Sequence, residues 1–324
     1  MLLNDARVRR GSGRRRVLAQ AIALGLLSLA VGVVAVAEDK KSAAPFKARK
    51  APLKGAPSGV KTAISAAAVK ARQVPSFRFE GEELYYSVEI SGSDAARASI
   101  RVGKRQKSKG VTYVPVAAKA ITHGFFAKSY PVNNKADTFI NVNTLQPIKS
   151  EKVIREKGES RVYSVRYDPA SYSARVDKEM SKDKKTRKRT YERPVPAAIH
   201  DGLSWVYELR MERLEKGDSY TYYIYDGWKL SQLKVTVVGK KKNVWTPLRE
   251  FDTIKVDVER TILSSSWPKG SKSKSNPRLS NREKPYYFST IFLSDDEARV
   301  PVRIFVTSKK ADSELKLVKY VPSK

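Results

Sequence analysis

The segment Leu84-Tyr85-Tyr86-Ser87-Val88-Glu89-Ile90 decides the fold class of this chain. Large apolar or aromatic side chains occupy every second position in it, and Ser91-Gly92 then ends the pattern. Alternation with a period of two puts one set of side chains on each face of a strand, so the segment predicts a β-strand with one buried face. The following segment, 96–102, is the expected hairpin partner.

Short alternating segments of the same kind continue to the end of the chain. Clusters of Gly, Asn, Asp, Pro or Lys bound each of them, which is typical of strands joined in a meander. Asp226-Gly227 between two of them predicts a tight hairpin turn. We therefore predict a mainly β fold: a large curved antiparallel sheet, an open barrel or a sandwich, with about fourteen strands. The further predicted strands are 111–116, 125–130, 138–142, 148–155, 161–167, 171–176, 220–225, 228–238, 244–249, 253–263, 286–293, 300–307 and 313–320.

One segment departs from the strand pattern. Its apolar side chains follow helical spacing at Leu203, Val206, Tyr207, Met211 and Leu214. Asp201 is a suitable N-terminal cap, and Lys216-Gly217 is a suitable C-terminal stop. We expect one amphipathic helix over 201–216 that packs on the sheet, either as a lid over a concavity or as ordinary core.

The N-terminal region predicts export. Residues 1–16 are rich in arginine, 17–37 carry no charge, and the run closes on Ala35-Val36-Ala37. This order is typical of a cleaved signal peptide over 1–37, and an uncleaved membrane anchor is the alternative. Arg14-Arg15 fits twin-arginine export as well as an ordinary basic start. We expect a periplasmic or secreted protein of the bacterial cell envelope.

The remainder divides into two parts. Residues 38–75 are dominated by Ala, Lys, Pro and Ser, which predicts a disordered basic linker. Residues 76–324 are long enough for a single β-rich domain. The chain has no cysteine, so its core has to provide the stability that disulfides often provide in exported domains.

The charge of the chain is strongly positive. It has 64 Lys and Arg against 33 Asp and Glu, a formal net charge of +31. Such a field attracts polyanions. Export makes nucleic acid an unlikely partner and favours lipid headgroups, lipopolysaccharide or acidic glycans. Basic clusters fall at the predicted loops 101–109, 178–193, 240–242 and 269–284, where they either form a cationic rim or simply solvate scattered loops. The candidate contacts to an anionic surface are Lys104, Arg105, Lys184, Lys185, Arg187, Lys188 and Arg189.

Aromatic side chains crowd the predicted helix and the hairpin after it. The candidate ligand-binding residues are Trp205, Tyr207, Tyr223, Tyr225 and Trp228. Tyr and Trp combine apolar area with a polar tip, so such a set suits the lining of a cleft. Core packing and cross-strand pairing are the alternative interpretation.

No catalytic, metal or cofactor motif is recognisable. His123 and His200 lack a second ligand at metal-site spacing, and no hydrolase or phosphate-loop motif occurs. Asp295-Asp296-Glu297 are adjacent, so on a strand they would point to opposite faces, and a turn explains them better than paired catalytic carboxylates. We expect no enzyme, no metal site and no cofactor.

The order of several motifs resembles a known family. They are Gly81-Glu82-Glu83-Leu84-Tyr85-Tyr86, Asp201-Gly202-Leu203-Ser204, Leu293-Ser294-Asp295-Asp296 and Arg299-Val300-Pro301-Val302. The chain resembles the exported bacterial family called domain of unknown function 3108 over nearly all of 77–321. Its basic segments 178–193 and 266–285 look longer than is usual there. The resemblance implies an exported antiparallel β fold of the Gram-negative envelope, and it implies no activity.

Three functions remain open from the sequence. The leading hypothesis is a periplasmic binding module that holds a lipid or another amphiphilic anionic ligand in a β concavity. The second is a structural or assembly factor that binds envelope glycans or a protein through its basic surface. The third is a hydrolase of envelope polymers whose catalytic residues come from distant strands.

Overall fold

The computed structural model describes residues 77–156, 158–183, 185–265, 287–307 and 312–323. The predicted signal peptide and linker, the basic segment 269–284 and Lys184 therefore lie outside the described residues. Within those residues, no helix combines the length and the apolar composition needed to cross a bilayer.

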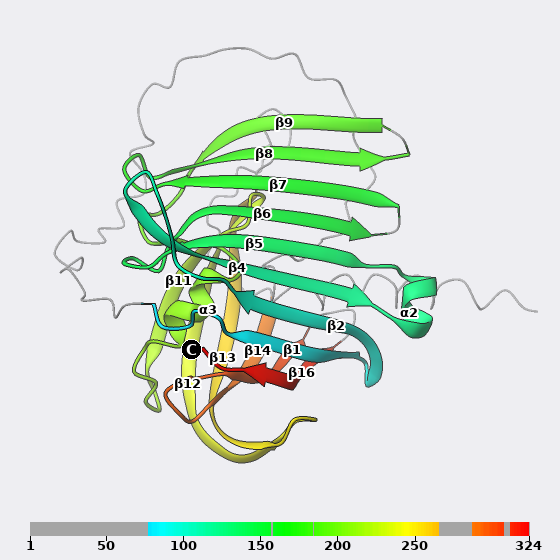
Figure 1. Cartoon of the computed structure of the whole chain (residues 1–324), viewed down its shortest axis with the longest axis vertical. Coiled ribbons are helices and arrows are strands. Elements are labelled where there is room, and N and C mark those ends of the chain that lie inside the picture. The colour runs from blue at the N-terminus through cyan, green and yellow to red at the C-terminus, as the bar shows by residue number, and fades with distance from the viewer. Residues whose placement is uncertain (1–76, 157, 184, 266–286, 308–311, 324) are drawn as a thin grey trace, which may run out of the picture.

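Strands dominate the described structure, and two short helices interrupt them (Figure 1). The strands are β1 (Glu83–Ile90), β2 (Ser93–Val102), β3 (Gln106–Ser108), β4 (Val111–Thr122), β5 (Asn133–Asn141), β6 (Pro147–Glu156), β7 (Glu159–Asp168), β8 (Ser173–Lys182), β9 (Lys185–Pro194), β10 (Ile199–His200), β11 (Ser219–Tyr225), β12 (Lys229–Trp245), β13 (Glu250–Ser265), β14 (Tyr287–Ser294), β15 (Pro301–Thr307) and β16 (Ser313–Val321). The helices are α2 (Gly124–Ser129) and α3 (Ser204–Leu209).

All of these strands belong to one sheet. Its order is β10-β11-β12-β13-β14-β15-β16-β1-β2-β4-β5-β6-β7-β8-β9, with β3 paired to β4. Every described pairing is antiparallel except β10 with β11. Pairing of β1 with β16 joins the first strand to the last, with Val88 opposite Leu315. The predicted mainly β fold with a large curved antiparallel sheet is confirmed.

The alternation in β1 is confirmed side chain by side chain. Leu84, Tyr86, Val88 and Ile90 are buried, while the residues between them are only half-buried. Burial on one face only is the expected consequence of a sheet that covers a core with one side and meets solvent with the other.

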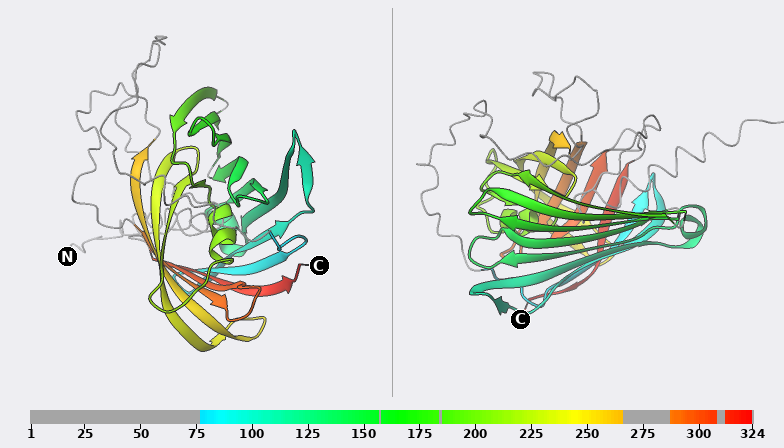
Figure 2. Two further views of the ribbon diagram at one scale, coloured as in Figure 1. Left: turned by 90° about the vertical axis from the view of Figure 1, so that its left-hand side faces the viewer. Right: turned by 90° about the horizontal axis from the view of Figure 1, so that it is seen from above.

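The sheet curls around α3, as the two views in Figure 2 show. Its two ends meet where the turn between β11 and β12 touches strands β6 and β7. Lys152 Nζ donates a hydrogen bond to the Asp226 carbonyl at 2.9 Å, and the Tyr167 hydroxyl donates to the Tyr225 carbonyl at 2.8 Å. The sheet is therefore open in its hydrogen bonding but held together by side chains.

The α3 segment lies between two buried clusters and contributes side chains to both. Trp205 and Leu209 belong to the first, formed mainly by β1, β2 and β11–β16. Leu203 and Tyr207 belong to the second, formed mainly by β4–β8 and the β11–β12 turn. A helix at the centre of a curled sheet can use both of its sides for packing, so α3 connects the two halves of the interior.

One helix prediction and one strand prediction need correction. The helix expected over 201–216 is only Ser204–Leu209, because the chain turns at Arg210, whose guanidinium is fixed by the Ala298 carbonyl and Glu82. The strand expected over 125–130 is the helix α2, closed by a Tyr130 N–H bond to the Phe126 carbonyl at 2.7 Å. Two adjacent phenylalanines break the period-two pattern there, which is the physical reason for the error.

Several basic segments predicted as loops are strands. Residues 178–182 lie in β8 and 185–193 in β9, and 240–242 lie inside β12. The predicted strand 244–249 is the end of β12 plus a turn. Basic side chains are tolerated on β9 because this strand lies at the edge of the sheet, where charged residues also discourage pairing with other chains.

Candidate ligand site on the inner face of the sheet

One face of strands β6–β9 points to the inside of the curled sheet. Tyr163, Val165 and Val176 define it, because they pack in the same buried cluster as Trp228 of the opposing hairpin. Residues directly opposite each other on antiparallel strands point to the same side. The register therefore identifies every other side chain on this face.

Every charged residue on the inner face of the β8–β9 hairpin is basic. The pairs on it are Ala174–Arg193, Val176–Tyr191, Lys178–Arg189, Met180–Arg187 and Lys182–Lys185. Six cations and no acid thus share this side of the two strands. We call this set the inner basic face: Lys178, Lys182, Lys185, Arg187, Arg189 and Arg193.

The outer face of the same hairpin has the opposite composition. It holds all three acids of the two strands, Asp177, Glu179 and Glu192. Lys188 lies there, with its ammonium 3.2 Å from the Glu179 carboxylate. An ion pair therefore joins the two strands on the outside of the hairpin. On the inside, the Lys182 ammonium lies 3.9 Å from the Glu159 carboxylate.

The predicted anionic-surface residues are divided by this geometry. Lys185, Arg187 and Arg189 share the inner basic face, whereas Lys188 is on the outer face. Lys104 and Arg105 follow β2 at the other end of the strands, opposite the β8–β9 turn (Figure 1), and Arg105 is paired with Glu80 at 2.7 Å. Of the six predicted residues that the structure describes, three thus share one face.

A cluster of lysines and aromatic rings lies at the base of the inner basic face. The ammonium groups of Lys152 and Lys178 are 4.7 and 5.1 Å from the Tyr163 ring centroid. Those of Lys229 and Lys178 are 4.9 and 5.6 Å from the Trp228 ring centroid. We call Lys152, Tyr163, Lys178, Trp228 and Lys229 the lysine–aromatic cluster. Aromatic faces attract cations and so offset part of the cost of burying them.

Asp226 supplies the carboxylate beside this cluster. Its Oδ1 accepts the backbone N–H groups of Trp228 and Lys229 at 2.8 and 2.7 Å, which fixes the hairpin turn. Its Oδ2 is 3.8 Å from the guanidinium of Arg260, which also donates to the Ser231 hydroxyl at 3.1 Å. One acid therefore faces several buried cations.

Burial perturbs the two inner lysines strongly. Burial, together with the nearby cations Arg161, Arg260 and Lys178 and against the opposing effect of Asp226, lowers the pKa of Lys152 to about 8. Burial likewise lowers the pKa of Lys229 to about 8. Desolvation disfavours the charged form of a lysine, and neighbouring cations add to that effect.

The predicted aromatic residues do not line one cleft. Trp205 packs against Tyr222 in the first cluster, with ring centroids 5.9 Å apart. Tyr207, Tyr225 and Trp228 are buried in the second cluster, and Tyr223 is half-buried against it. An apolar cavity between α3 and the sheet, lined by Leu84, Tyr207 and Ile304 among others, measures about 30 Å³. Small-molecule pockets measure about 300–1,000 Å³, so this cavity is far too small for a lipid chain.

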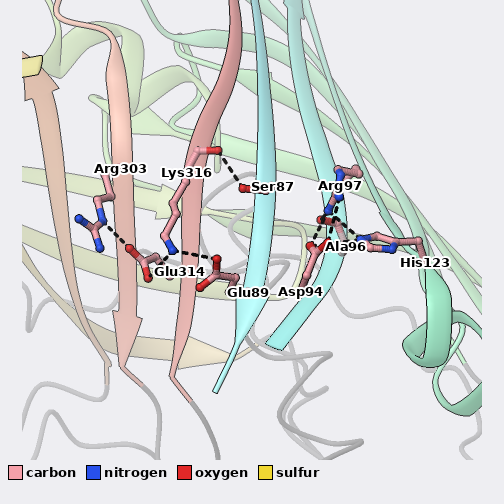
Figure 3. Close-up of polar contacts among 9 residues, drawn as sticks. All are labelled: Ser87, Glu89, Asp94, Ala96, Arg97, His123, Arg303, Glu314 and Lys316. Atoms are coloured by element: carbon pink, nitrogen blue, oxygen red, sulfur yellow. Dashed lines mark hydrogen bonds and ion pairs between the residues drawn. The ribbon is translucent and has the colours of Figure 1, made fainter. Parts of the chain in front are cut away.

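The histidines and the acidic triplet have structural surroundings. Figure 3 shows His123 beside Asp94 and Arg97, with Nε2 3.2 Å from the Asp94 carboxylate. Hydrogen bonding from Arg97 lowers the pKa of Asp94. His200 is buried between Ser204 and Glu208. Asp295-Asp296-Glu297 form the turn between β14 and β15, as expected. In the described chain, no group of three or more acidic or histidine side chains is placed to hold a metal.

The outer face near the middle of the sheet carries a ladder of ion pairs, also drawn in Figure 3. Lys316 on β16 lies 2.8 Å from Glu89 on β1 and 3.5 Å from Glu314 on its own strand. Glu314 also pairs with Arg303 on β15. Alternating signs across neighbouring strands favour the register and contrast with the single sign of the inner basic face.

Sequence reasoning missed the buried cations Lys152, Lys229 and Arg260. A signal for them was present. Lys152 lies two positions before Ile154, and Arg260 lies two and four positions after Val258 and Val256. In an alternating strand this spacing places the charged side chain on the same, buried face, which is rare unless the charge is paired or functional.

Comparison with known proteins gives the family. The model of the family described as "Protein of unknown function (DUF3108)" matches residues 83–317. This chain belongs to that family. The DUF3108 match begins with β1 and ends in β16, so it includes the inner basic face and the lysine–aromatic cluster. The resemblance seen in the sequence motifs is confirmed, and the family carries no established activity.

Three solved structures are similar to this DUF3108 chain, each over 76% of it and 99% of the other chain. A β-barrel-like protein of domain of unknown function DUF1849 from Brucella abortus is 9% identical, with a TM-score of 0.46. A protein described as exported, with a YmcC-like fold, from Bacteroides fragilis is 11% identical, with a TM-score of 0.32. A protein described as a lipoprotein from Parabacteroides distasonis is 14% identical, with a TM-score of 0.31. No curated protein matches the chain.

Proposed function

We propose that this DUF3108 protein is an exported binding module of the Gram-negative cell envelope, which holds an amphiphilic anionic ligand against the inner side of its curved sheet. The observation that carries the proposal is the sidedness of the β8–β9 hairpin. Six cations share its inner face, while its three acids lie on the outer face. A predominantly basic concave surface concentrates ligands of negative charge.

The composition of the interior supports an amphiphile over a purely polar anion. The inner basic face continues directly into the apolar side chains Val165, Val176 and Tyr163. A ligand with a charged head and an apolar body would contact both surfaces at once. Because the enclosed cavity is small, the ligand would lie on the open side of the curl and not inside a closed core.

The signal-peptide pattern over 1–37 supports the envelope location. In that compartment, anionic lipid headgroups and lipopolysaccharide are abundant partners for a basic surface. Nucleic acid is not expected there, and the proposal requires no catalysis, metal or cofactor.

A mass measurement tests the proposal. The full-length chain, with its own N-terminal segment, is expressed in a Gram-negative host, purified from the periplasm and analysed by native mass spectrometry before and after organic extraction. We expect an additional mass that extracts as lipid. The variant Arg187→Glu/Arg189→Glu should lose it, and the outer-face control Lys188→Glu should keep it.

Other outcomes would redirect the assignment. A chain free of additional mass, which also fails to bind anionic lipid in salt-sensitive assays, would exclude the amphiphile-binding function. Salt-sensitive binding to envelope glycans or to a protein, without lipid, would favour the structural or assembly role. Equal loss in the inner and outer variants would show that the inner face is not the site.

A further inference from the structure

A row of cations runs across the inner side of the sheet from its exposed edge to its interior. The register pairs Lys152 with Tyr163, Tyr163 with Lys178, and Lys178 with Arg189. Neighbouring strands are about 4.8 Å apart, so this row extends for about 14 Å. Arg189 at one end is exposed, whereas Lys152 at the other is 6% exposed.

Cations also approach this row from the opposite wall. Lys229 on β12 and Arg260 on β13 are 6% and 7% exposed. The charges that act most strongly on Lys152 are the cations Arg161, Arg260 and Lys178 and the acid Asp226. Arg161 is itself paired with Glu156 and Glu159. Lys152 and Lys229 share the influence of one carboxylate, Asp226, which also lies 3.8 Å from Arg260.

A purely structural role accounts poorly for this arrangement. Buried charges are expensive unless they are paired, and apolar residues of similar volume usually serve a core at least as well. The faces of Tyr163 and Trp228 offset only part of that cost. A site that binds an anion, in contrast, requires an excess of positive charge when the anion is absent.

We infer that the lysine–aromatic cluster receives the phosphate monoester group of the ligand. This inference rests on the proposed function and specifies the head group. A phosphate monoester carries nearly two negative charges at neutral pH and three acceptor oxygens. Lys178 shares the Tyr163 ring with Lys152 and the Trp228 ring with Lys229. A pair of lysine ammoniums matches the charge of a phosphate monoester, whereas a carboxylate carries only one negative charge. The inner basic face provides the path by which the phosphate group reaches the cluster from solvent. Arg189 lies at the exposed edge of this path, and Lys178 lies opposite it on β8.

Binding assays with defined probes test the inference on the full-length protein. The probes are dodecyl phosphate below its micelle concentration, dodecyl maltoside with the same tail and no charge, and glucose 1-phosphate with no tail. Isothermal titration compares the wild type with Lys152→Met, Lys229→Met and the outer-face control Lys188→Met. We expect each inner variant to bind dodecyl phosphate about tenfold more weakly or worse, because each lost charged hydrogen bond weakens binding by that order. The control should bind like the wild type.

Two further readouts separate a binding role from a structural one. Lys152→Met should raise the melting temperature while it weakens binding, because removing a buried charge should outweigh the loss of its hydrogen bond to the Asp226 carbonyl. A structural lysine would lower both the melting temperature and binding when replaced. In the wild type, NMR titration of lysine side chains should show the pKa values of Lys152 and Lys229 rising when dodecyl phosphate binds. Lys229→Met alone suffices for the test if Lys152→Met does not fold.

The outcomes distinguish this inference from the proposed function. If dodecyl phosphate binds with unchanged affinity in both lysine variants but is lost in Arg187→Glu/Arg189→Glu, the cluster assignment is wrong and the amphiphile-binding function stands. If no phosphate probe binds the wild type, the cluster assignment is wrong; additional lipid mass in the native spectrum would then still uphold the proposed function. Binding that depends on Lys152 and Lys229 supports the assignment. Tighter binding of dodecyl phosphate than of glucose 1-phosphate would indicate a lipid ligand, and equal affinity for the two probes would indicate a soluble phosphate ester.

Discussion

Lys152 and Lys229 are charged groups in an interior that disfavours charge. Both have a folded-state pKa of about 8, below the ordinary lysine value of 10.5. The unfolded chain therefore binds more protons than the folded chain between about pH 8 and pH 10. These lysines destabilise the fold at neutral pH and do so less as they lose their protons.

We predict that the free energy of unfolding rises between pH 7.5 and pH 9.5 through these two lysines. Urea unfolding of the wild type at pH 7.5, 8.5 and 9.5 measures the rise. The variant Lys152→Met/Lys229→Met should show a flatter dependence, and Lys188→Met should keep the slope of the wild type. A wild-type curve that falls over this range would contradict the assigned direction.

Gly227 occupies a turn that only glycine fits. Its φ is +82°, and a Cβ atom there would lie 2.9 Å from Cγ2 of Val165. Gly92 has a similar φ of +79° in the turn between β1 and β2, but with open space around it. The left-handed conformation alone costs a side chain about 1–2 kcal/mol.

We predict that Gly227→Ala destabilises the fold more than Gly92→Ala, by about 1–3 kcal/mol, because the first change adds overpacking against β7. Urea unfolding of the two variants gives the comparison. Equal losses would mean that the β11–β12 turn does not press against β7 as closely as described.

At the scale of elements, the α3 segment depends on one buried ion pair. Arg210 is 1% exposed and donates to both carboxylate oxygens of Glu82, at 2.7 and 2.5 Å. It also donates to the Ala298 carbonyl at 2.8 Å, and its guanidinium lies 4.0 Å from the Phe79 ring centroid. The pair thus joins the end of α3 to the start of β1 and to the turn between β14 and β15.

We predict that Arg210→Met destabilises the protein by about 3–5 kcal/mol, because Glu82 would remain buried without its partner. The double variant Glu82→Leu/Arg210→Met should recover a large part of that loss, since it leaves no unpaired charge. Chemical unfolding of the single and double variants measures both effects. A double variant no more stable than Arg210→Met would contradict this account.

The β8–β9 hairpin has two faces of different composition. Its basic residues look alike in the sequence, yet alternate positions lie on the inner basic face or on the outer face with the three acids. We predict that Arg187→Glu/Arg189→Glu reduces binding to vesicles containing phosphatidylglycerol at least tenfold at low salt, whereas Lys188→Glu changes it less than threefold, since exposed ion pairs contribute little. Cosedimentation at two salt concentrations measures both, and equal effects would refute the sidedness.

At the scale of the whole molecule, the two buried clusters are connected by α3. Leu209 packs in the first cluster and Leu203 in the second, six residues away on the same segment. A curled open sheet without such a connection would be free to unfold from either end. The shared helix and the contacts of the β11–β12 turn should therefore make its unfolding cooperative.

We predict one unfolding transition for the domain. Leu209→Ala and Leu203→Ala should each cost about 2–5 kcal/mol and shift that same transition. Hydrogen exchange followed by mass spectrometry should show strands β5–β7 and β12–β14 losing protection together. Separate transitions, with each variant affecting only one half, would show that the clusters fold independently.

Local patterns were sufficient for much of this architecture. Alternation reports that a strand has one buried face, so the segment from Leu84 to Ile90 and most other strands could be identified directly. The Asp226-Gly227 turn and the turn at Asp295-Asp296 follow from local chemistry in the same way. The family match rests on motifs of this local kind.

The site could be predicted only in outline. The charge of segment 178–193 is visible in the sequence, and three of its five predicted contact residues do share one face. The length of α3 was overestimated because Arg210 is held by Glu82 and Ala298, which are distant in the chain. No local pattern contains that information.

The clustering of charge belongs to the folded sheet alone. A strand that shifts by one residue exchanges its two faces, so the side on which Arg187 or Lys188 lies depends on register with β8. Lys152 reaches the Asp226 carbonyl because the sheet curls until the β11–β12 turn meets β6, and curvature is a property of all its strands together. Short-range alternation in the sequence therefore determines which segments form strands. The concave basic surface depends on the tertiary structure, because the register and twist of many strands together bring its side chains to one side.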